Sequence, residues 1–497
     1  MKKIKLLCLL TLFSCCMKAQ DPIQIRQLNL QEVIKLATDS SLNSFIAQNT
    51  YYAGYWSYRN FKAQKLPFLD FSAIPMNFTR QVNQQYNFLD SSFYYVEQQT
   101  LSSTANMSLN QIVTATGGRF YIDSDLGYLN NLNKSAGGQY SSTPLRVGFS
   151  QQLFGFNTYK WKNTIEPLKF EKAKKQLIES LEDISIRAVD CFFEMARAEI
   201  NLKIASTNLA NADTLYSIGL KRAEIAAITQ GDIYTLKLDV INSRNNYQIA
   251  LINLRRARMN LYSLLRLDIR VDIELILPEQ IPEIQLNPVQ CLELARENNP
   301  DILDFNRQRL EAERDVEQAK KNSRFSANLN ASFGLNQQGN NLQAAYNNPL
   351  DQELVRVGIN IPILDWGLVK GEYRLAQKNK EVINASLAQA EVDFVQTVLL
   401  TVEEFILQEE LVSGAAEADT IAGIAYDIAM QRFIAGNADI VKLSISQASS
   451  IAAKRSYINA LESYWNYYYT MRKLTLYDIE KQQSLMDRFD DIVGLEN

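Results

Sequence analysis

LRVGFSQQLFGFN, residues 145–157, and VRVGINIPILDWG, residues 355–367, carry the same pattern at positions 210 residues apart (355 − 145). In both stretches apolar side chains alternate with polar ones, and this period of two is that of a β-strand with two different faces. Each stretch is followed by a long pattern typical of an α-helix. The sequence therefore predicts a repeated unit in which a strand leads into a long helix.

The alternation assigns apolar side chains to one face of each strand and mostly polar ones to the other. The apolar faces carry Leu145, Val147, Phe149 and Leu153 in the first copy, and Val355, Val357, Ile359, Ile361 and Ile363 in the second. The opposite faces carry Arg146, Ser150 and Gln152, and Arg356, Gly358 and Asn360. A soluble sandwich shows this pattern, and so does a transmembrane barrel strand with lipid on one side and water on the other. The pattern alone does not choose between them.

The N-terminus has the layout of a secretory signal peptide, predicted over residues 1–20. Lys2, Lys3 and Lys5 precede an apolar run over 6–13, and small or polar residues follow, with cleavage expected near Ala19 or Gln20. An alternative is a lipidation site at Cys15 or Cys16, although the bulky Phe13 matches such a site poorly. No other window holds the roughly 20 apolar residues of a membrane-spanning helix. Any membrane insertion is therefore expected to use a β-barrel.

The composition excludes several classes of protein. The chain has 51 basic and 55 acidic residues, and loss of four lysines with the signal leaves 47 against 55, so a nucleic-acid partner is not expected. Histidine is absent, which removes Ser-His-Asp and Cys-His nucleophile systems and the commonest zinc ligand. There is no phosphate-binding glycine loop. We expect no enzyme, no cofactor and no metal site. Cys191 and Cys291 fit buried apolar positions better than a disulfide.

Two halves of the chain open in the same way. LNLQEVIKLA at 28–37 corresponds to LNPVQCLELA at 286–295, a separation of 258 residues (286 − 28). Asn29 and Asn287 suit the N-cap of a helix, and Pro288 suits its first position. Each helix is expected to run about 35 residues before a strand begins. The predicted domains are a first repeat over 21–285 and a second over 286–497.

Each half then predicts a pair of strands. In the first half a strand begins near Pro67, with Leu69, Phe71 and Ala73 on one face, and in the second half residues 327–336 alternate cleanly. Residues 337–351 read as an exposed loop. The corresponding part of the first half, 80–143, is much longer and contains a hairpin over 108–129 with its turn at Gly117 and Gly118. These extra strands could extend a barrel or form an external flap.

Long antiparallel helical hairpins follow the strands. Residues 158–218 and 368–428 each predict 61 residues of helix, turns are expected at 225–231 and 433–437, and returning helices at about 232–267 and 439–477. Asp232 and Asp439 are the expected N-caps of the returning helices. Narrow apolar stripes, such as Leu254, Ala257, Leu261 and Leu264, indicate lateral coiled-coil packing. An elongated soluble coiled-coil scaffold is the alternative, but it explains neither the strand pairs nor the export signal.

With this order of elements the chain resembles the TolC family of outer-membrane efflux channels. The most specific stretches are 28–37, VGINIPILDWGLVKGEY at 357–373 and QRFIAGNADIVKLSISQA at 431–448. The resemblance implies an α+β membrane protein, a homotrimer whose transmembrane β-barrel continues into a periplasmic α-helical barrel. It implies an exit duct for efflux or type I secretion in the outer membrane of a Gram-negative bacterium. The implied partners are a periplasmic adaptor protein and an inner-membrane pump.

The resemblance also implies a site at the turns between paired helices, where the periplasmic end closes and meets the adaptor. The candidates in this chain are Ile228, Gly231, Asp232, Arg432, Gly436 and Asp439. Gly436 could equally end a helix, and Asp439 could cap one. Some family members carry an acidic constriction just after the second turn, but Lys442 and Ile445 stand there in this chain. A negative ring would instead need Asp232 or Asp439, repeated threefold.

A second candidate site is the passage from strand to helix, which is rich in aromatic side chains. We expect a membrane-interface belt made of Phe154, Phe156, Tyr159, Trp161 and Trp366. The alternative is ordinary packing at the junction.

Overall fold

The computed structural model describes residues 25–88, 91–133, 137–224, 228–268, 271–278, 281–323, 325–434 and 440–494. The chain forms two compact units. The strand unit comprises Tyr52–Ala173 and Asp301–Val392, and the helical unit comprises Lys174–Pro300, Asp393–Asn497 and the residues up to Tyr51. The division into units therefore does not follow the predicted repeats, which stay a prediction about the order of elements.

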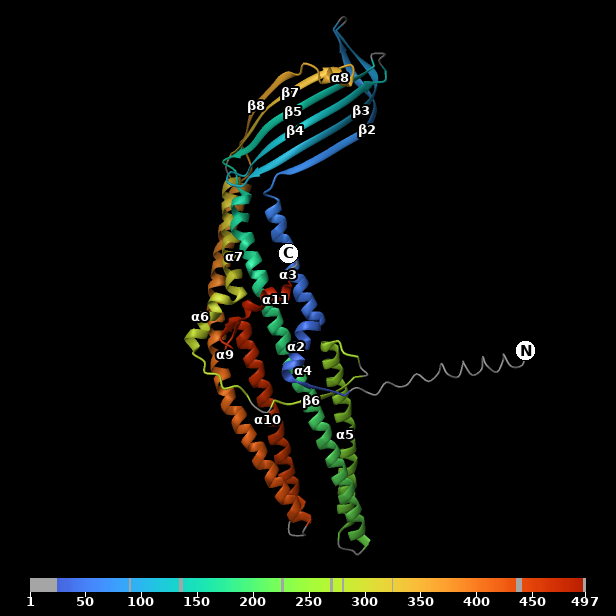
Figure 1. Ribbon diagram of the computed structural model, residues 1–497, viewed down its shortest axis with the longest axis vertical. Helices are drawn as coiled ribbons and strands as arrows, with labels where there is room; N and C mark the ends of the chain where they lie inside the picture. The colour runs from blue at the N-terminus through green and yellow to red at the C-terminus, as the bar shows by residue number, and fades with distance from the viewer. Residues whose placement is uncertain are drawn as a thin grey trace, which may run out of the picture. The chain divides into compact units, whose positions relative to one another are not determined.

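A six-stranded antiparallel sheet dominates the described part of the strand unit (Figure 1). Its spatial order is β2-β3-β4-β5-β7-β8. The strands are β2 (Phe68–Asn87), β3 (Ser92–Val113), β4 (Gly118–Asn131), β5 (Gly138–Leu153), β7 (Ser326–Gly339) and β8 (Leu350–Asn360). The strands predicted near 67, 145, 327 and 355 are thus confirmed, and the fold is α+β.

The hairpin predicted over 108–129 is confirmed, and it belongs to the same sheet. Strands β3 and β4 pair along Thr100–Val113, and Gly117 makes the turn with a φ of +77° while Gly118 already opens β4. β4 continues the ladder onto β5. The extra strands therefore extend the sheet.

Two predicted boundaries in the strand unit are wrong. β8 ends at Asn360, so Ile361 and Ile363 lie outside the strand, because Pro362 lacks the N–H that a ladder needs. The predicted loop at 337–351 is shorter than expected, since β7 runs to Gly339 and β8 starts at Leu350. Between them lies the short helix α8 (Leu342–Ala345), whose first turn is capped by Asn341.

The opening helices are also shorter than predicted. α2 (Leu30–Ser40) starts with the expected cap, because Asn29 and Glu32 exchange hydrogen bonds in a capping box. The backbone is extended at Ser41, which ends α2, and α3 (Leu42–Ala63) follows. Likewise α6 (Pro288–Asn298) stops at Asn299 before α7 (Pro300–Asn322), because the residue before a proline avoids helical geometry. Both breaks fall 258 residues apart (299 − 41), as do the caps.

A short parallel sheet was not predicted. β1 (Ile25–Asn29) pairs with β6 (Asp272–Ile276), which joins the start of α2 to the end of the first helical hairpin. A pairing across about 247 residues leaves no periodic signal in either five-residue segment, so local pattern could not reveal it.

The long helices are confirmed, with corrected ends. α4 (Thr158–Glu224) and α9 (Leu368–Ile434) start where predicted and run six residues further, and α5 (Gln230–Leu265) and α10 (Ile440–Thr475) return. In the helical unit α4 packs against α10, with Phe192, Phe193 and Tyr464 fully buried. In the predicted stripe of α5, Ala257, Leu261 and Leu264 are buried and Leu254 is half-buried. Among the described residues, no helix is both long enough and apolar enough to cross a membrane.

A buried ion-pair cluster fixes the C-terminal segment of the helical unit. The segment holds β9 (Tyr477–Asp478), β10 (Gln483–Ser484), the 3-10 helix η1 (Leu485–Arg488) and α11 (Phe489–Val493). Arg472 donates to both carboxylate oxygens of Glu182 at 3.0 and 2.8 Å, and to Asp478 Oδ2 at 3.0 Å. All three side chains are buried. The guanidinium therefore ties α4, α10 and the C-terminal segment together.

We expect Arg472→Leu to destabilise the C-terminal segment by about 3–5 kcal/mol, because the buried carboxylates of Glu182 and Asp478 lose the guanidinium that pairs with both. Hydrogen exchange of peptides covering 477–494 would measure this opening. The matched control is Lys473→Leu, whose partner Asp183 is half-exposed and whose loss should cost under about 1 kcal/mol. Equal protection in the two variants would contradict the assignment.

Candidate functional site

One face of the sheet carries mostly apolar side chains on all six strands, with Glu353 of β8 as a charged exception beside Phe333. A single cross-strand row runs through Leu69, Leu109, Ile122, Val147 and Phe333, and the neighbouring row contains Phe120, Phe149, Ala331 and Val355. These side chains are not covered, since Leu69 is 63% exposed, Phe333 55% and Val355 76%. A soluble sandwich would bury such a face under a second sheet.

The opposite face is polar and carries a charge cluster, here named the polar-face cluster: Asn106, Asp123, Asp125 and Arg146. Arg146 donates from Nε to Asp123 Oδ1 at 3.0 Å and from Nη2 to Asp125 Oδ2 at 2.9 Å. Asn106 donates to Asp125 Oδ1, and Asp123 is buried by these contacts. Sequence reasoning missed the two aspartates, although acidic residues at positions i and i+2 of a strand always share a face.

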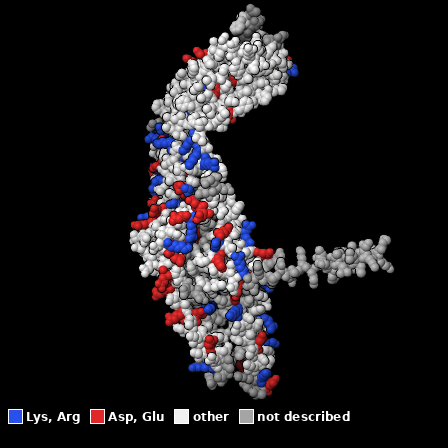
Figure 2. All heavy atoms as spheres, viewed as in Figure 1, with Lys and Arg blue, Asp and Glu red and all other residues white. Residues whose placement is uncertain are grey.

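The two faces together distinguish the alternatives that the strand pattern left open. A soluble monomer rarely exposes an apolar patch of this extent. A transmembrane barrel strand requires it, with lipid on the apolar side and water on the polar side. Figure 2 shows that charged side chains are sparse over the strands and that Lys and Arg gather where the strands give way to helices. The exposed face therefore fits a lipid-facing wall.

Both edges of the sheet are open within the described chain. β2 pairs only with β3, and β8 pairs only with β7. Their unpaired N–H and C=O groups could not be satisfied in hydrocarbon, where each would cost several kcal/mol. The sheet of one chain is thus incomplete as a membrane structure.

The predicted aromatic residues lie at the passage from strand to helix, but they do not behave alike. Phe154 and Trp366 are 64% and 90% exposed, both with a positive φ, whereas Phe156, Tyr159 and Trp161 are half-buried. Trp161 Nε1 donates to Glu317 Oε2 of α7 at 2.9 Å, and this contact favours ordinary packing at the junction for Trp161. The membrane-interface role stays a prediction, and exposure favours it for Phe154 and Trp366.

The predicted tip residues that the structure describes lie at the start of α5 and the end of α9, and the two helical hairpins point the same way in the helical unit (Figure 1). Asp232 is not the N-cap of α5: Thr229 is, and Asp232 completes a capping box three residues on, with Thr229 N donating to Asp232 Oδ2 at 2.9 Å. These hydrogen bonds from Thr229 lower the pKa of Asp232. Ile228 is half-buried, and Gly231, Asp232 and Arg432 are exposed. Gly436 and Asp439 lie outside the described residues.

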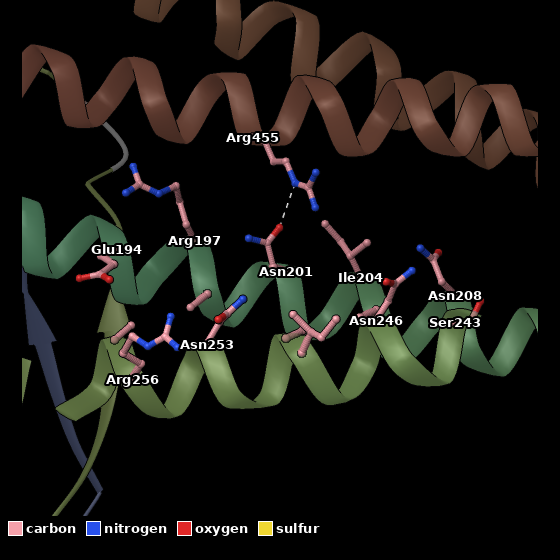
Figure 3. Close-up of a pocket in the computed structure, with 15 residues that line it drawn as sticks. Glu194, Arg197, Asn201, Ile204, Asn208, Ser243, Asn246, Asn253, Arg256 and Arg455 are labelled. Carbon is pink, nitrogen blue, oxygen red and sulfur yellow. Dashed lines mark hydrogen bonds between the residues drawn. The ribbon is translucent and has the colours of Figure 1, made fainter. Parts of the chain in front are cut away.

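A polar hollow of about 490 Å³ lies between α4 and α5, with Arg455 of α10 at its rim (Figure 3). Asn201 accepts a hydrogen bond from Arg455 Nε at 2.9 Å, and Arg197 pairs with Glu462. Nothing in this lining resembles catalytic or cofactor chemistry. Within the described ranges, no three His, Cys, Asp or Glu side chains are placed to hold a metal ion. Cys191 and Cys291 are both free thiols, and burial raises the pKa of each.

The fold is that of a known class of protein, the outer-membrane channels with a helical domain. The structure is similar to the CmeC outer membrane channel of Campylobacter jejuni, with a TM-score of 0.66 and 13% identity over 93% of this chain and 89% of that one. It is also similar to the open state of the MtrE outer membrane channel of Neisseria gonorrhoeae (TM-score 0.57, 14% identity, 90% of this chain and 89% of that one). A third similar structure is VceC, an outer membrane protein of Vibrio cholerae, with a TM-score of 0.57 and 15% identity over 91% of this chain and 96% of that one.

The sequence points to the same class. Residues 291–475 match the family model described as outer membrane efflux protein, whereas no curated protein matches the chain. The predicted resemblance, the function as an outer-membrane efflux channel subunit and the localisation in the outer membrane of a Gram-negative bacterium are confirmed. The matched family consists of channel proteins rather than enzymes, and the soluble scaffold is not supported.

The stability of the helical unit is expected to depend on pH through Glu199. Burial, opposed by Arg258 and assisted by the carboxylates of Asp272 and Glu274, raises the pKa of Glu199 in α4 to about 7. Between the ordinary value of 4.5 and 7 the folded state holds more protons than the unfolded chain, so stability falls as pH rises through this window.

We expect hydrogen exchange around Glu199, corrected for its intrinsic pH dependence, to show weaker protection at pH 8 than at pH 5. Glu199→Gln should remove the difference, and Asp213→Asn on an exposed position of the same helix should keep it. A pH dependence that survives Glu199→Gln would contradict the assignment.

Proposed function

We propose that three copies of this chain form one exit duct, with a shared β-barrel in the outer membrane and a shared helical barrel in the periplasm. A periplasmic adaptor and an inner-membrane pump would complete the pathway, and substrates would leave the cell through the duct. The single observation that carries this proposal is the exposed apolar sheet with two open edges. Joining β2 of one copy to β8 of the next would satisfy the edge groups of every copy.

The helical unit supports the same assembly. Within one chain α4 and α10 are neighbours, joined by Asn208 with Gln447 and by Asp190 with Asn466. α5 and α9 therefore lie on the outer flanks of this group (Figure 1).

Each outer flank carries an exposed apolar seam. The seam residues are Leu400, Leu407, Ile421 and Ile428 on α9, and Leu238, Ile241, Ile249, Ile252 and Met259 on α5. All four on α9 are separated by multiples of seven residues. On α5 the same spacing relates Leu238, Ile252 and Met259. All nine side chains are 47–59% exposed. A seven-residue spacing is the signature of a coiled-coil seam that still needs a partner helix.

The two seams differ, so one copy offers two different surfaces. Pairing α5 of one copy with α9 of the next is a head-to-tail contact, and such contacts close into a ring when the rotation permits. The same ring would bring three sets of hairpin tips together. This supports placing the adaptor contact at Ile228, Gly231, Asp232 and Arg432, and at Gly436 and Asp439 outside the described residues.

The assembly can be tested on the α9 seam. We expect the double variant Leu407→Glu with Ile421→Glu to lose the trimer, because it would put six like charges into the apolar seams of the ring. Native mass spectrometry of the detergent-extracted protein would measure the number of copies. The control is Leu407→Met with Ile421→Leu, which keeps apolar volume and should keep three copies. A native protein with one copy, or a charged variant with three, would contradict the proposal.

A further inference from the structure

We infer that β3 and β4 form part of the lipid-facing wall, so that each copy supplies six strands and the duct in the membrane has eighteen (3 × 6). This inference rests on the proposed trimeric duct and adds the width of its membrane part. It also assigns the polar-face cluster to the water-filled lumen. A duct of this width suits bulky, hydrated solutes rather than only small ones.

The pairing of the added strands is continuous with the rest of the sheet. β4 pairs with β3 along its whole length and with β5 from Arg119–Ser150 to Asn130–Gly138, apart from an irregularity at Asp123–Asp125. β3 has 22 residues and β4 has 14, which exceeds the 9–11 residues that a tilted strand needs to cross a bilayer. A hairpin folded away from the wall would have no reason to share this ladder.

The apolar face does not stop at the added strands. Met107 of β3 is 48% exposed and Ile122 of β4 is 41% exposed, close to Val147 of β5 at 43%. The face thus has the same character on β3 and β4 as on β5. Lipid is the occupant that fits an uncovered, continuous and mostly apolar face of this kind.

The polar face of the added strands carries charged and polar side chains, which suit contact with water. Asp123 and Asp125 are held by Arg146 of β5, and Asn106 of β3 donates to Asp125. Tyr121 lies over Gly148, where a Cβ would come within 2.1 Å of the ring, so the glycine leaves room for the tyrosine on this face. Three copies would place three such clusters around the lumen.

The strand number sets the width because the diameter of a barrel grows roughly linearly with it. Barrels of 16–18 strands leave an aqueous channel, whereas about eight strands leave room only for side chains or one small ligand. Without β3 and β4 each copy would have four strands, and three copies would give twelve. The added hairpin therefore widens the duct by about half.

Spin-label accessibility in proteoliposomes tests the inference. Single cysteines are placed at Ile122 on β4 and at Phe333 on β7, in a Cys191→Ala and Cys291→Ala background, and labelled with a nitroxide. We expect both labels to collide with oxygen dissolved in lipid and to be shielded from a water-soluble nickel complex. Labels at Ser108 and Asn330, on the polar face, should show the reverse.

The outcomes separate the two claims. A label at Ile122 that meets the nickel complex, while the label at Phe333 stays in lipid, would overturn the inference and leave the proposed duct standing. Water exposure at both positions would overturn the duct as well. If Ile122→Cys does not assemble, Leu109→Cys in the same row of β3 gives the same test.

Discussion

The apolar face of the sheet is the constraint on which the rest of this structure depends. Burying one large apolar side chain is worth about 1.5–3 kcal/mol, and the face presents such side chains on every strand. No second sheet of the described chain covers them. In water this face would drive aggregation, whereas in a bilayer it is the correct surface. The environment of the sheet thus follows from the alternation of its side chains.

The open edges extend the same argument to assembly. In lipid an unpaired strand edge is intolerable, so a sheet with two free edges must close, and in the proposed trimer the other copies supply the missing neighbours. The exposed apolar seams on α5 and α9 also require a partner, because in water they are stabilised by packing against another helix. One head-to-tail ring would satisfy both. The membrane part and the helical part would then share the same threefold symmetry, because the same ring of copies closes both.

Much of the fold could be predicted because its signals are local. Asn29 with Glu32, Gly117 and Pro288 mark caps and turns by their own chemistry, and the strand alternation and long helical periods needed no tertiary context. The break at Asn299 was readable from Pro300 but was overlooked, and its counterpart at Ser41 has no such signal. Thr229 was missed as the cap because Asp232 is an equally good cap by residue type.

The remaining features depend on contacts distant in sequence. The parallel pair of β1 and β6, and the cluster of Arg472 with Glu182 and Asp478, join segments that no local pattern connects. Membership of β3 and β4 in the sheet was equally undecidable, because a flap and a wall have the same alternation. The tip residues were predicted from resemblance alone, and for Gly436 and Asp439 that remains their only support.

Single-channel recording tests the central claim most directly. The purified protein, added to a planar lipid bilayer, is predicted to give discrete current steps of uniform size, because closing the sheet into a barrel creates one defined water-filled path. Protein that is folded and incorporated into the lipid yet carries no current would contradict the account, since the polar face of its sheet would then enclose no channel.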